Sequence, residues 1–234
     1  EFTIYFYEYF LIIANFKNKL YIMINIKTFV FNGFQENTFV LFDETKECII
    51  IDAGCYDNSE KENLVSFIEN NNLKHVKLVN THGHIDHLLG VNFLRGKYNI
   101  PFEAHKLDEP IVCSTNEYAE LFGFSFNDAP TIDNYLNEID EIKFGNSSLE
   151  IFHVPGHSPG SLAFYSKSQE FVIVGDVLFN GSIGRTDLPG GDYDTLIHSI
   201  KTKLLNLPEN VEVLSGHGNN TSIAYEKKTN PFLI

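Results

Sequence analysis

The sequence predicts an α/β fold whose strands and helices alternate along the chain and whose candidate metal site lies along one edge. Short apolar runs typical of strands are separated by stretches with helical spacing or by glycine-containing turns. The side chains best suited to bind a metal all follow directly after predicted strands. Because the sequence shows no repeat, low-complexity tract or linker, we expect one layered body.

Length and composition fit one domain with a full core, since the chain has 234 residues with 43% hydrophobic content. The 31 acidic and 17 basic residues give a formal charge of −14. This charge argues against a nucleic-acid partner, because phosphate binding requires clustered Lys and Arg. Cys48, Cys55 and Cys113 are odd in number and lack metal-site spacing. They are typical of free thiols in a reducing compartment, so we expect the protein in the cytoplasm.

The start of the chain reads differently from the rest. The only methionine is Met23, and the apolar stretch at 4–16 is interrupted by Glu8. This stretch lacks the basic region and cleavage site of a signal peptide and is too short for a membrane span. We therefore expect residues 1–22 to be upstream or vector-derived sequence, and residues 23–234 to form a single domain.

Five strands are predicted in the first part of this domain, at 26–31, 37–42, 48–51, 75–80 and 101–104. The run at 48–51 is continuously apolar, which indicates a strand covered on both faces. Asp52 ends this run and is either a turn residue or a group that orients a neighbouring loop.

Three helices are predicted between these strands and after them. Ser59 is expected to cap the first helix through Glu62, with Leu64, Phe67 and Ile68 on its inner face. The other two helices are expected at 87–97 and 106–120. Phe122, Phe124 and Phe126 follow the last of them and belong either to the core or to the rim of a pocket.

The second part of the domain returns to regular patterning. A strand is predicted at 148–152, a hairpin of strands at 162–165 and 171–174, a helix near 193–205 and a strand at 211–214.

The strongest functional signal is the stretch N-T-H-G-H-I-D-H-L-L-G at 80–90, which follows a predicted strand. Imidazole nitrogens and carboxylate oxygens are the ligands that suit zinc and related divalent metals. His82 and His84 alternate, so they can point the same way at the end of a strand. Asp86 and His87 are adjacent and must point elsewhere. Two directions predict two metal ions.

Three further candidate ligands follow other predicted strands. His157 lies in a loop stiffened by glycine and proline, whereas His153, at the preceding strand end, is interpreted as structural. Asp176 follows a buried strand and is well placed to bridge two cations. His217 stands between two glycines at the end of the last strand.

Taken in order, these residues resemble the metal-binding series of the metallo-β-lactamase superfamily. The resemblance covers residues 24–232 and implies an αββα four-layer sandwich with a dinuclear site at the edge of its two sheets. It also implies that one metal is bound by His82, His84 and His157. The second would be bound by Asp86, His87 and His217, with Asp176 bridging both ions.

One branch of the superfamily fits best. The stretch G-D-V-L-F-N-G-S-I-G-R-T-D-L-P-G-G-D at 175–192 is similar to short bacterial glyoxalase II-like hydrolases, and so is the ending G-H-G-N-N-T-S-I with N-P-F further on. The resemblance implies a hydroxyacylglutathione hydrolase-like enzyme in which Arg185 contacts the substrate, where longer glyoxalase II enzymes carry a lysine. Asp187 stands where those enzymes carry a tyrosine, and their basic C-terminal region has no counterpart. The carrier thiol therefore stays open.

The expected reaction is hydrolysis of a thioester such as S-D-lactoylglutathione. Two cations about 3.5–4 Å apart share a water and lower its pKa from about 16 toward 7, which supplies a metal-bridging hydroxide. Asp86 is predicted to orient this hydroxide and accept its proton. Zinc is the expected metal, although iron and manganese accept the same ligands.

Three alternatives remain open. A mononuclear iron persulfide dioxygenase would use His82, His157 and Asp176. Another hydrolase of this fold would cleave a lactone or a different ester, and a non-catalytic metal-binding scaffold would tolerate loss of Asp86 or His217. The expected partner is a small-molecule substrate, without nucleic acid or membrane, and the sequence predicts no oligomeric state.

Overall fold

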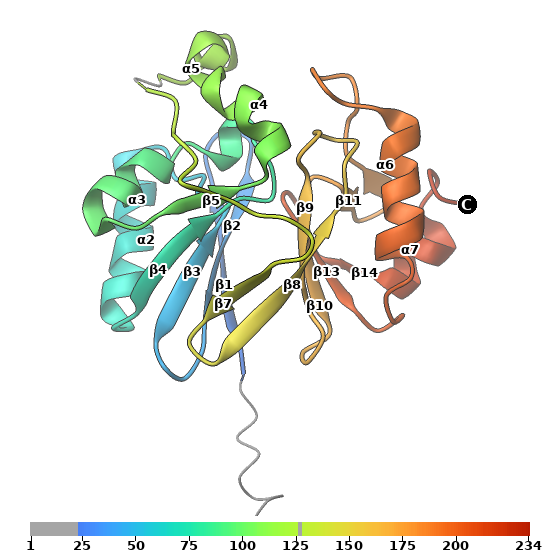
Figure 1. Ribbon diagram of the computed structural model, residues 1–234, viewed down its shortest axis with the longest axis horizontal. Coiled ribbons are helices and arrows are strands. Elements are labelled where there is room, and N and C mark those ends of the chain that lie inside the picture. Colours follow the sequence, from blue (N-terminus) through green and yellow to red (C-terminus); the bar gives the residue numbers. More distant parts are fainter. Residues whose placement is uncertain (1–22, 126–127) are drawn as a thin grey trace, which may run out of the picture.

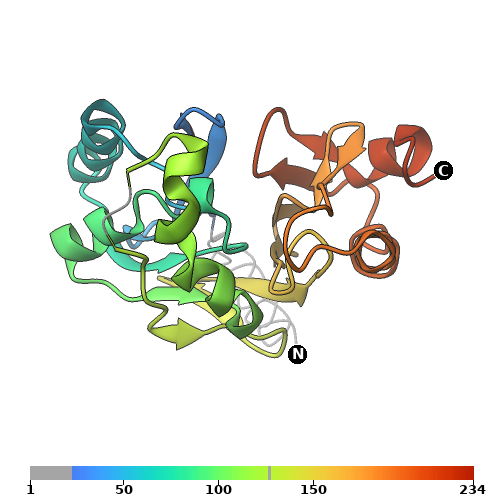
Figure 2. The same ribbon diagram turned by 90° about the horizontal axis from the view of Figure 1, so that it is seen from above.

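Two six-stranded sheets pack face to face with helices on their outer sides, in a computed structural model of the protein (Figure 1). The structure describes residues 23–125 and 128–234, so the predicted extension at 1–22 and Phe126 lie outside the described residues. Seen from above, the two sheets and their helices form two halves of the molecule (Figure 2). This order of layers confirms the predicted αββα sandwich.

The first sheet has the order β1-β2-β3-β4-β5-β6. Its strands are β1 (Asn25–Phe31), β2 (Glu36–Phe42), β3 (Glu47–Ile51), β4 (Lys74–Val79), β5 (Phe102–Ala104) and β6 (Asn134–Tyr135). β1 to β3 pair antiparallel, and β3 to β6 pair parallel. Helices α2 (Asn58–Asn70) and α3 (Val91–Tyr98) lie on the outer face of this sheet (Figure 1).

The second sheet has the order β14-β13-β10-β9-β8-β7 and uses only residues after the first sheet is complete. Its strands are β7 (Glu141–Phe144), β8 (Ser147–His153), β9 (Leu162–Ser166), β10 (Phe171–Gly175), β13 (Glu212–Ser215) and β14 (Thr221–Ser222). Helices α6 (Tyr193–Ser199) and α7 (Ile223–Thr229) lie on its outer side, and α6 continues as a π-helical turn, Ile200–Leu204. β11 (Leu178–Phe179) and β12 (Ser182–Ile183) form a separate small hairpin.

Alternation along the strands builds the layers. Phe39 and Leu41 of β2 point into the core between the two sheets, whereas Val40 points under the outer helices. β3 behaves in the same way, because Ile49 and Ile50 are both fully buried on opposite faces. The prediction that this strand is covered on both faces is confirmed.

Three helix predictions need correction. The cap of α2 is Asp57 with Glu60, not Ser59 with Glu62. Both pairs have the spacing of a capping box, but Glu60 is also anchored by the N–H groups of Asn32 and Tyr56, at 2.6 and 2.7 Å. Tertiary contacts therefore select where this helix begins.

The helix predicted at 106–120 is divided into short pieces. A 3₁₀ turn (Lys106–Asp108) precedes α4 (Glu109–Cys113), and α5 (Thr115–Tyr118) precedes a second 3₁₀ turn (Ala119–Phe122). Pro110 lies in the first turn of α4, where its missing N–H costs nothing, and thereby favours a new helix start.

The helix predicted at 87–97 begins later than expected. Ile85–His87 forms a 3₁₀ turn and α3 starts at Val91, so His87 belongs to the turn.

Within the described residues, no helix is long and apolar enough to cross a bilayer.

The ends of several strands meet at one edge of the sandwich. β4 and β8 lead into the loops that carry the histidines, and backbone hydrogen bonds join the sheets there. The Asn37 N–H donates to the Gly216 carbonyl at 2.7 Å, and the Leu162 N–H donates to the Thr81 carbonyl at 2.8 Å. The candidate site therefore lies on a seam that links both sheets.

Candidate metal centre

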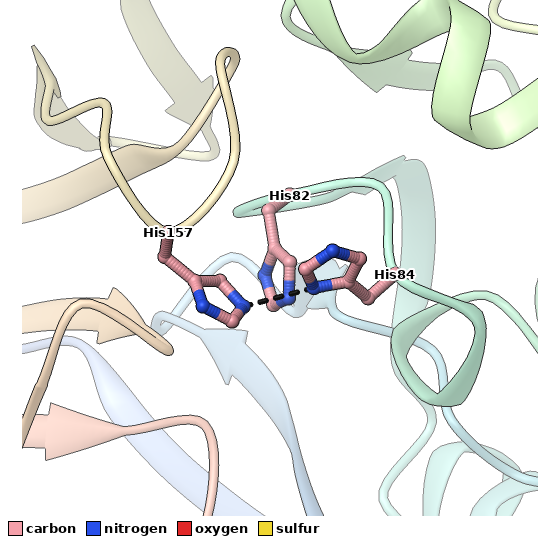
Figure 3. A group of neighbouring side chains, drawn as sticks. All are labelled: His82, His84 and His157. Carbon is pink, nitrogen blue, oxygen red and sulfur yellow. Dashed lines mark hydrogen bonds between the residues drawn. The ribbon is translucent and has the colours of Figure 1, made fainter. Parts of the chain in front are cut away.

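Three histidines from two loops form what we call the first group: His82, His84 and His157. Their rings point toward one another from the loops after β4 and β8 (Figure 3). His84 Nδ1 lies 2.8 Å from His157 Nε2, and one nitrogen of each ring lies within 4.8 Å of the others. Burial lowers the pKa of His82 well below its usual value and that of His84 to about 3. These two imidazoles are therefore neutral at pH 7, which is the form that binds metals.

Asp86, His87 and His217 form the second group. His217 Nε2 lies 3.1 Å from Asp86 Oδ2, and His87 Nε2 lies 3.6 Å from the same oxygen. Burial opposes the charged form of both histidines, but nearby carboxylates outweigh it. Those of Asp86 and Asp176 raise the pKa of His87 well above its usual value, and their hydrogen bonds raise that of His217 to about 10.

Asp176 stands between the two groups, at the end of β10. Its carboxylate oxygens lie 3.5 Å from His87 Nε2, 3.4 Å from His217 Nε2 and 3.7 Å from His157 Nε2. Burial would raise the pKa of Asp176, but His87 and His217 together hold it well below the usual value. The carboxylate is therefore an anion in contact with members of both groups.

Among the buried atoms of this cluster that have no hydrogen-bond partner within the described residues are His82 Nε2, His87 Nε2 and Asp176 Oδ1. Buried polar atoms are normally paired, because an unpaired one loses its hydration without compensation. All three are metal-binding atoms and face the same cluster. The residues present thus fit one or two divalent cations.

The remaining ring nitrogens are held from behind. His157 Nδ1 and His217 Nδ1 lie 2.8 and 3.0 Å from the carbonyl oxygens of Arg185 and Phe34. A carbonyl only accepts, so each Nδ1 carries a hydrogen, and Nε2 is the atom that would bind a metal in the neutral ring. Such outer contacts fix the direction and tautomer of a metal-binding histidine.

Asp52 and Thr81 contact two further histidines of the cluster, His87 and His82, from behind. Asp52 Oδ2 accepts the Thr81 hydroxyl hydrogen at 2.6 Å and lies 3.1 Å from His87 Nδ1. Because the Thr81 hydroxyl donates to Asp52, it accepts from His82 Nδ1 at 3.0 Å. Asp52 also has a left-handed backbone, with φ of 54°. The two readings of Asp52, turn residue and orienting group, therefore both hold.

Sequence reasoning missed two buried carboxylates next to the site. Glu36 Oε1 lies 3.8 Å from His87 Nδ1, and its other oxygen accepts from the Thr38 hydroxyl at 2.8 Å. Asp108 binds the loops of the first group. Neither residue stands near a candidate metal ligand in sequence, so the sequence carried no local signal for either of them.

Arg185 reaches the site through its main chain. Its carbonyl holds His157, while its exposed guanidinium forms two hydrogen bonds of 2.7 Å with the carboxylate of Asp187. The side chain expected to contact substrate is thus already paired with an acid.

The histidines outside the cluster have other roles. His153 ends β8 and contacts the Pro159 carbonyl at 2.9 Å, as a structural residue would, and stacks on His105. His75, near the start of β4, is half-buried and stacks on Tyr98 with ring centroids 3.7 Å apart.

The aromatic segment divides between core and surface. Phe124 is buried against Tyr56, whereas Phe122 is exposed and contacts the exposed Phe34. Since the Phe34 carbonyl holds His217, this exposed aromatic pair lies next to the second group.

Comparisons with known proteins show the family of the chain. The model of the "Metallo-beta-lactamase superfamily" matches residues 31–217. The hydroxyacylglutathione hydrolase GloC of Haemophilus influenzae is 39% identical over 211 residues, which cover 89% of this chain and 98% of that protein.

Two solved structures have the same fold. The BLEG-1 B3 metallo-beta-lactamase has a TM-score of 0.81 and 36% identity, and the match covers 89% of this chain and 99% of that one. TTHA1623, solved in a di-iron-bound form, has a TM-score of 0.80 and 34% identity, with coverage of 88% and 100%.

Proposed function

The chain belongs to the metallo-beta-lactamase superfamily and is a metallo-hydrolase, and we propose that its substrate is a thioester such as S-D-lactoylglutathione. The similarity to a hydroxyacylglutathione hydrolase over nearly the whole of that protein supports this substrate class. The cluster of unpaired metal-binding atoms between the two sheets is the observation that carries the hydrolytic part.

In this proposal His82, His84 and His157 hold one metal ion. Asp86, His87 and His217 hold the second, and Asp176 contacts both. A pair of bound cations would supply hydroxide at neutral pH and Lewis acidity toward a carbonyl oxygen. We propose zinc for both positions, with iron as the competing metal, because the related TTHA1623 was solved in a di-iron form.

Asp86 is the proposed catalytic residue. Burial alone would raise the pKa of its carboxyl, but the stronger effect of His87 and His217 lowers that pKa below its usual value. The group is therefore ionised at neutral pH. An ionised carboxylate can accept a proton from the attacking water and can orient that water by hydrogen bonding. No strong acid is required on the leaving side, because thiols have a pKa of about 8.5 and depart as thiolates.

Arg185 is the proposed contact for an anionic group of the carrier thiol. The Arg185 carbonyl contacts His157, and its guanidinium is exposed but paired with Asp187. A carboxylate of the substrate would therefore replace Asp187 in a two-pronged hydrogen bond of the kind guanidinium groups favour. This competition predicts weaker recognition of anionic carriers than an unpaired arginine would give.

Free cysteines support a reducing compartment, and we propose the cytoplasm. Cys48 and Cys55 are buried, Cys113 is exposed, and none of the three is in a disulfide. The proposed partner is a small molecule, since the formal charge of −14 argues against binding of nucleic acid.

The rate of S-D-lactoylglutathione hydrolysis by the zinc-loaded protein tests this function, with His84→Ala as the matched blank. We expect rapid hydrolysis that the variant loses. A protein that binds two metals but leaves this thioester intact would contradict the substrate. Acyl-coenzyme A thioesters, a lactone and a β-lactam would then be compared under the same conditions.

Oxygen uptake, measured together with the metal content, separates the hydrolase from a persulfide dioxygenase. A hydrolase releases free thiol without oxygen uptake, whereas a persulfide dioxygenase consumes oxygen on addition of glutathione persulfide. Oxygen uptake by a protein with a single iron would overturn the thioesterase proposal.

A further inference from the structure

Asp108 is a buried carboxylate that belongs to neither group of the metal centre. It ends the 3₁₀ turn Lys106–Asp108 between β5 and α4, and none of its surface is exposed. Its oxygens accept hydrogen bonds from the Gly83 N–H at 2.8 Å, the Ser158 hydroxyl at 2.7 Å and the Gly160 N–H at 2.5 Å. All three donors lie in the two loops that carry the first group.

The positions of these donors are significant. Gly83 stands between His82 and His84, so its N–H belongs to the peptide bond that joins His82 to Gly83. Ser158 directly follows His157. Fixing these neighbours restricts the directions in which the three imidazoles can point.

The two loops come from different sheets. One follows β4 of the first sheet, and the other follows β8 of the second. Asp108 comes from a third segment and contacts both. It therefore acts across the seam, where the 2.8 Å approach of His84 to His157 must be maintained.

The glycines of these loops make room for the carboxylate. A Cβ atom on Gly160 would lie 2.7 Å from Asp108 Cγ, and one on Gly83 would lie 3.2 Å from Asp108 Cβ. Both separations are shorter than ordinary carbon–carbon contacts of about 3.5–4.0 Å. The backbone N–H donors can reach Asp108 at these distances only because no side chain intervenes.

We propose that Asp108 is a positioning residue for the first group: its carboxylate holds the His82–His84 loop and the His157 loop in register and thereby sets the affinity of that group for metal. The inference rests on the proposed metal-binding role of the first group, but it does not depend on which ester is cleaved. Burial raises the pKa of Asp108, and the three donors oppose this shift by stabilising the anion.

Asp43 provides a matched control. It is also buried and accepts hydrogen bonds from the Thr45 and Asn146 N–H groups and the Ser147 hydroxyl, at 3.0, 2.7 and 2.9 Å. Like Asp108, it joins loops of the two sheets. Asp43 follows β2 at the end opposite Glu36, which lies beside the metal centre. Seven extended residues at about 3.3 Å each place Asp43 about 23 Å from Glu36.

The test measures zinc affinity by competition with a chromophoric chelator, in a His217→Ala background that disables the second group. Asp108→Asn keeps the shape of the side chain but presents an NH₂ group to a donor. We expect zinc to bind the first group 10- to 100-fold more weakly in Asp108→Asn, the usual effect of losing an outer support. Asp43→Asn should change this affinity less than twofold. Thermal unfolding should show that both variants are destabilised.

Ser158→Ala keeps the inference testable if Asp108→Asn does not fold. It removes one donor and leaves the two backbone contacts, so a smaller loss of zinc affinity is expected. Unchanged affinity in a folded Asp108→Asn, or in Ser158→Ala where the first variant fails, would overturn the inference, as would an equal loss in Asp43→Asn. A His217→Ala protein without a tight zinc site would overturn the proposed first-group site as well.

Discussion

The two groups of the candidate metal centre lie side by side but differ in charge. In the first group, burial dominates and lowers the pKa of His82 and His84. In the second, carboxylates outweigh burial and raise the pKa of His87 and His217. Without metal, the neutral histidines of the first group can bind a cation directly. The histidines of the second group carry protons, which a metal ion would have to displace. The same residue type is thus prepared in two different ways by its surroundings.

The supports behind the two groups differ as well. Asp108 and Thr81 act on the first group, and Asp52 acts mainly on the second through His87. Asp176 contacts members of both groups directly. Substitutions at these positions should therefore separate the two groups experimentally.

Asp176→Asn should have the largest effect. Its carboxylate approaches His157 of one group and His87 of the other, so its loss weakens both. Each group should lose about 10- to 100-fold in metal affinity or activity, and the two losses multiply. The rate of hydrolysis should therefore fall roughly a thousandfold. The catalytic rate and the number of bound metals check this. A variant that lost one metal and kept the other at full affinity would show that Asp176 serves a single group.

Thr81→Val should weaken the first group more than the second, because the hydroxyl contacts His82 directly and reaches His87 only through Asp52. The substitution removes the hydroxyl that His82 Nδ1 contacts but keeps the Thr81 N–H, which donates to Asp52 at 2.7 Å. First-group zinc affinity should fall about tenfold. Chelator competition in the His217→Ala and His84→Ala backgrounds measures each group separately. Equal losses in both would mean that Thr81 acts through Asp52 instead.

The difference in charge predicts a difference in proton release. An imidazolium must lose its proton before it can bind a metal, so filling the second group at pH 7.5 should release protons. Filling the first group should release fewer. Calorimetric titration with zinc in two buffers of different ionisation enthalpy counts these protons for each step. Identical proton release in both steps would remove the distinction between the groups.

The same shift predicts how the metal-free protein responds to pH. The folded-state pKa of His217 is about 10, above its ordinary value of 6.5, so its proton contributes stability below pH 6.5. This contribution should be lost as the pH rises from about 6.5 to 10. Thermal unfolding of metal-free protein against His217→Gln measures it, and the parent should lose more stability over this range than the variant.

Arg185→Gln should have the smallest effect on the metal centre. Its contact with His157 is made by the main-chain carbonyl, which the substitution keeps. First-group zinc affinity should stay within twofold, while KM for a carboxylate-bearing thioester should rise by about tenfold or less, since the guanidinium is exposed and shared. Asp187→Asn should lower the same KM. A lower KM in Arg185→Gln, or a higher KM in Asp187→Asn, would contradict the proposed role of Arg185.

Local spacing explains why most of the site could be predicted. His82, His84, Asp86 and His87 are close in sequence, so strand geometry alone predicts two directions. His157, Asp176 and His217 are distant in sequence, and each was identifiable because it follows a predicted strand at the same edge. Alternating apolar patterns predicted a layered α/β body, and the resemblance to the metallo-β-lactamase superfamily implied the αββα order, which the structure confirms.

Features set by tertiary contacts could not be predicted. Asp108 lies within a stretch whose composition favours a continuous helix, and its role depends on two loops remote in sequence. The start of α2 at Asp57 depends on a contact between Glu60 and the β1–β2 loop. Short strands such as β6 and β14 carry too few residues for a readable pattern.

The number of zinc ions bound per chain tests the central claim most directly, measured after equilibrium dialysis of the parent, His84→Ala and His217→Ala. The account predicts two ions in the parent and one tightly bound ion in each variant. A parent that binds a single ion at excess zinc, or variants that each lose both ions, would contradict the existence of two separate groups.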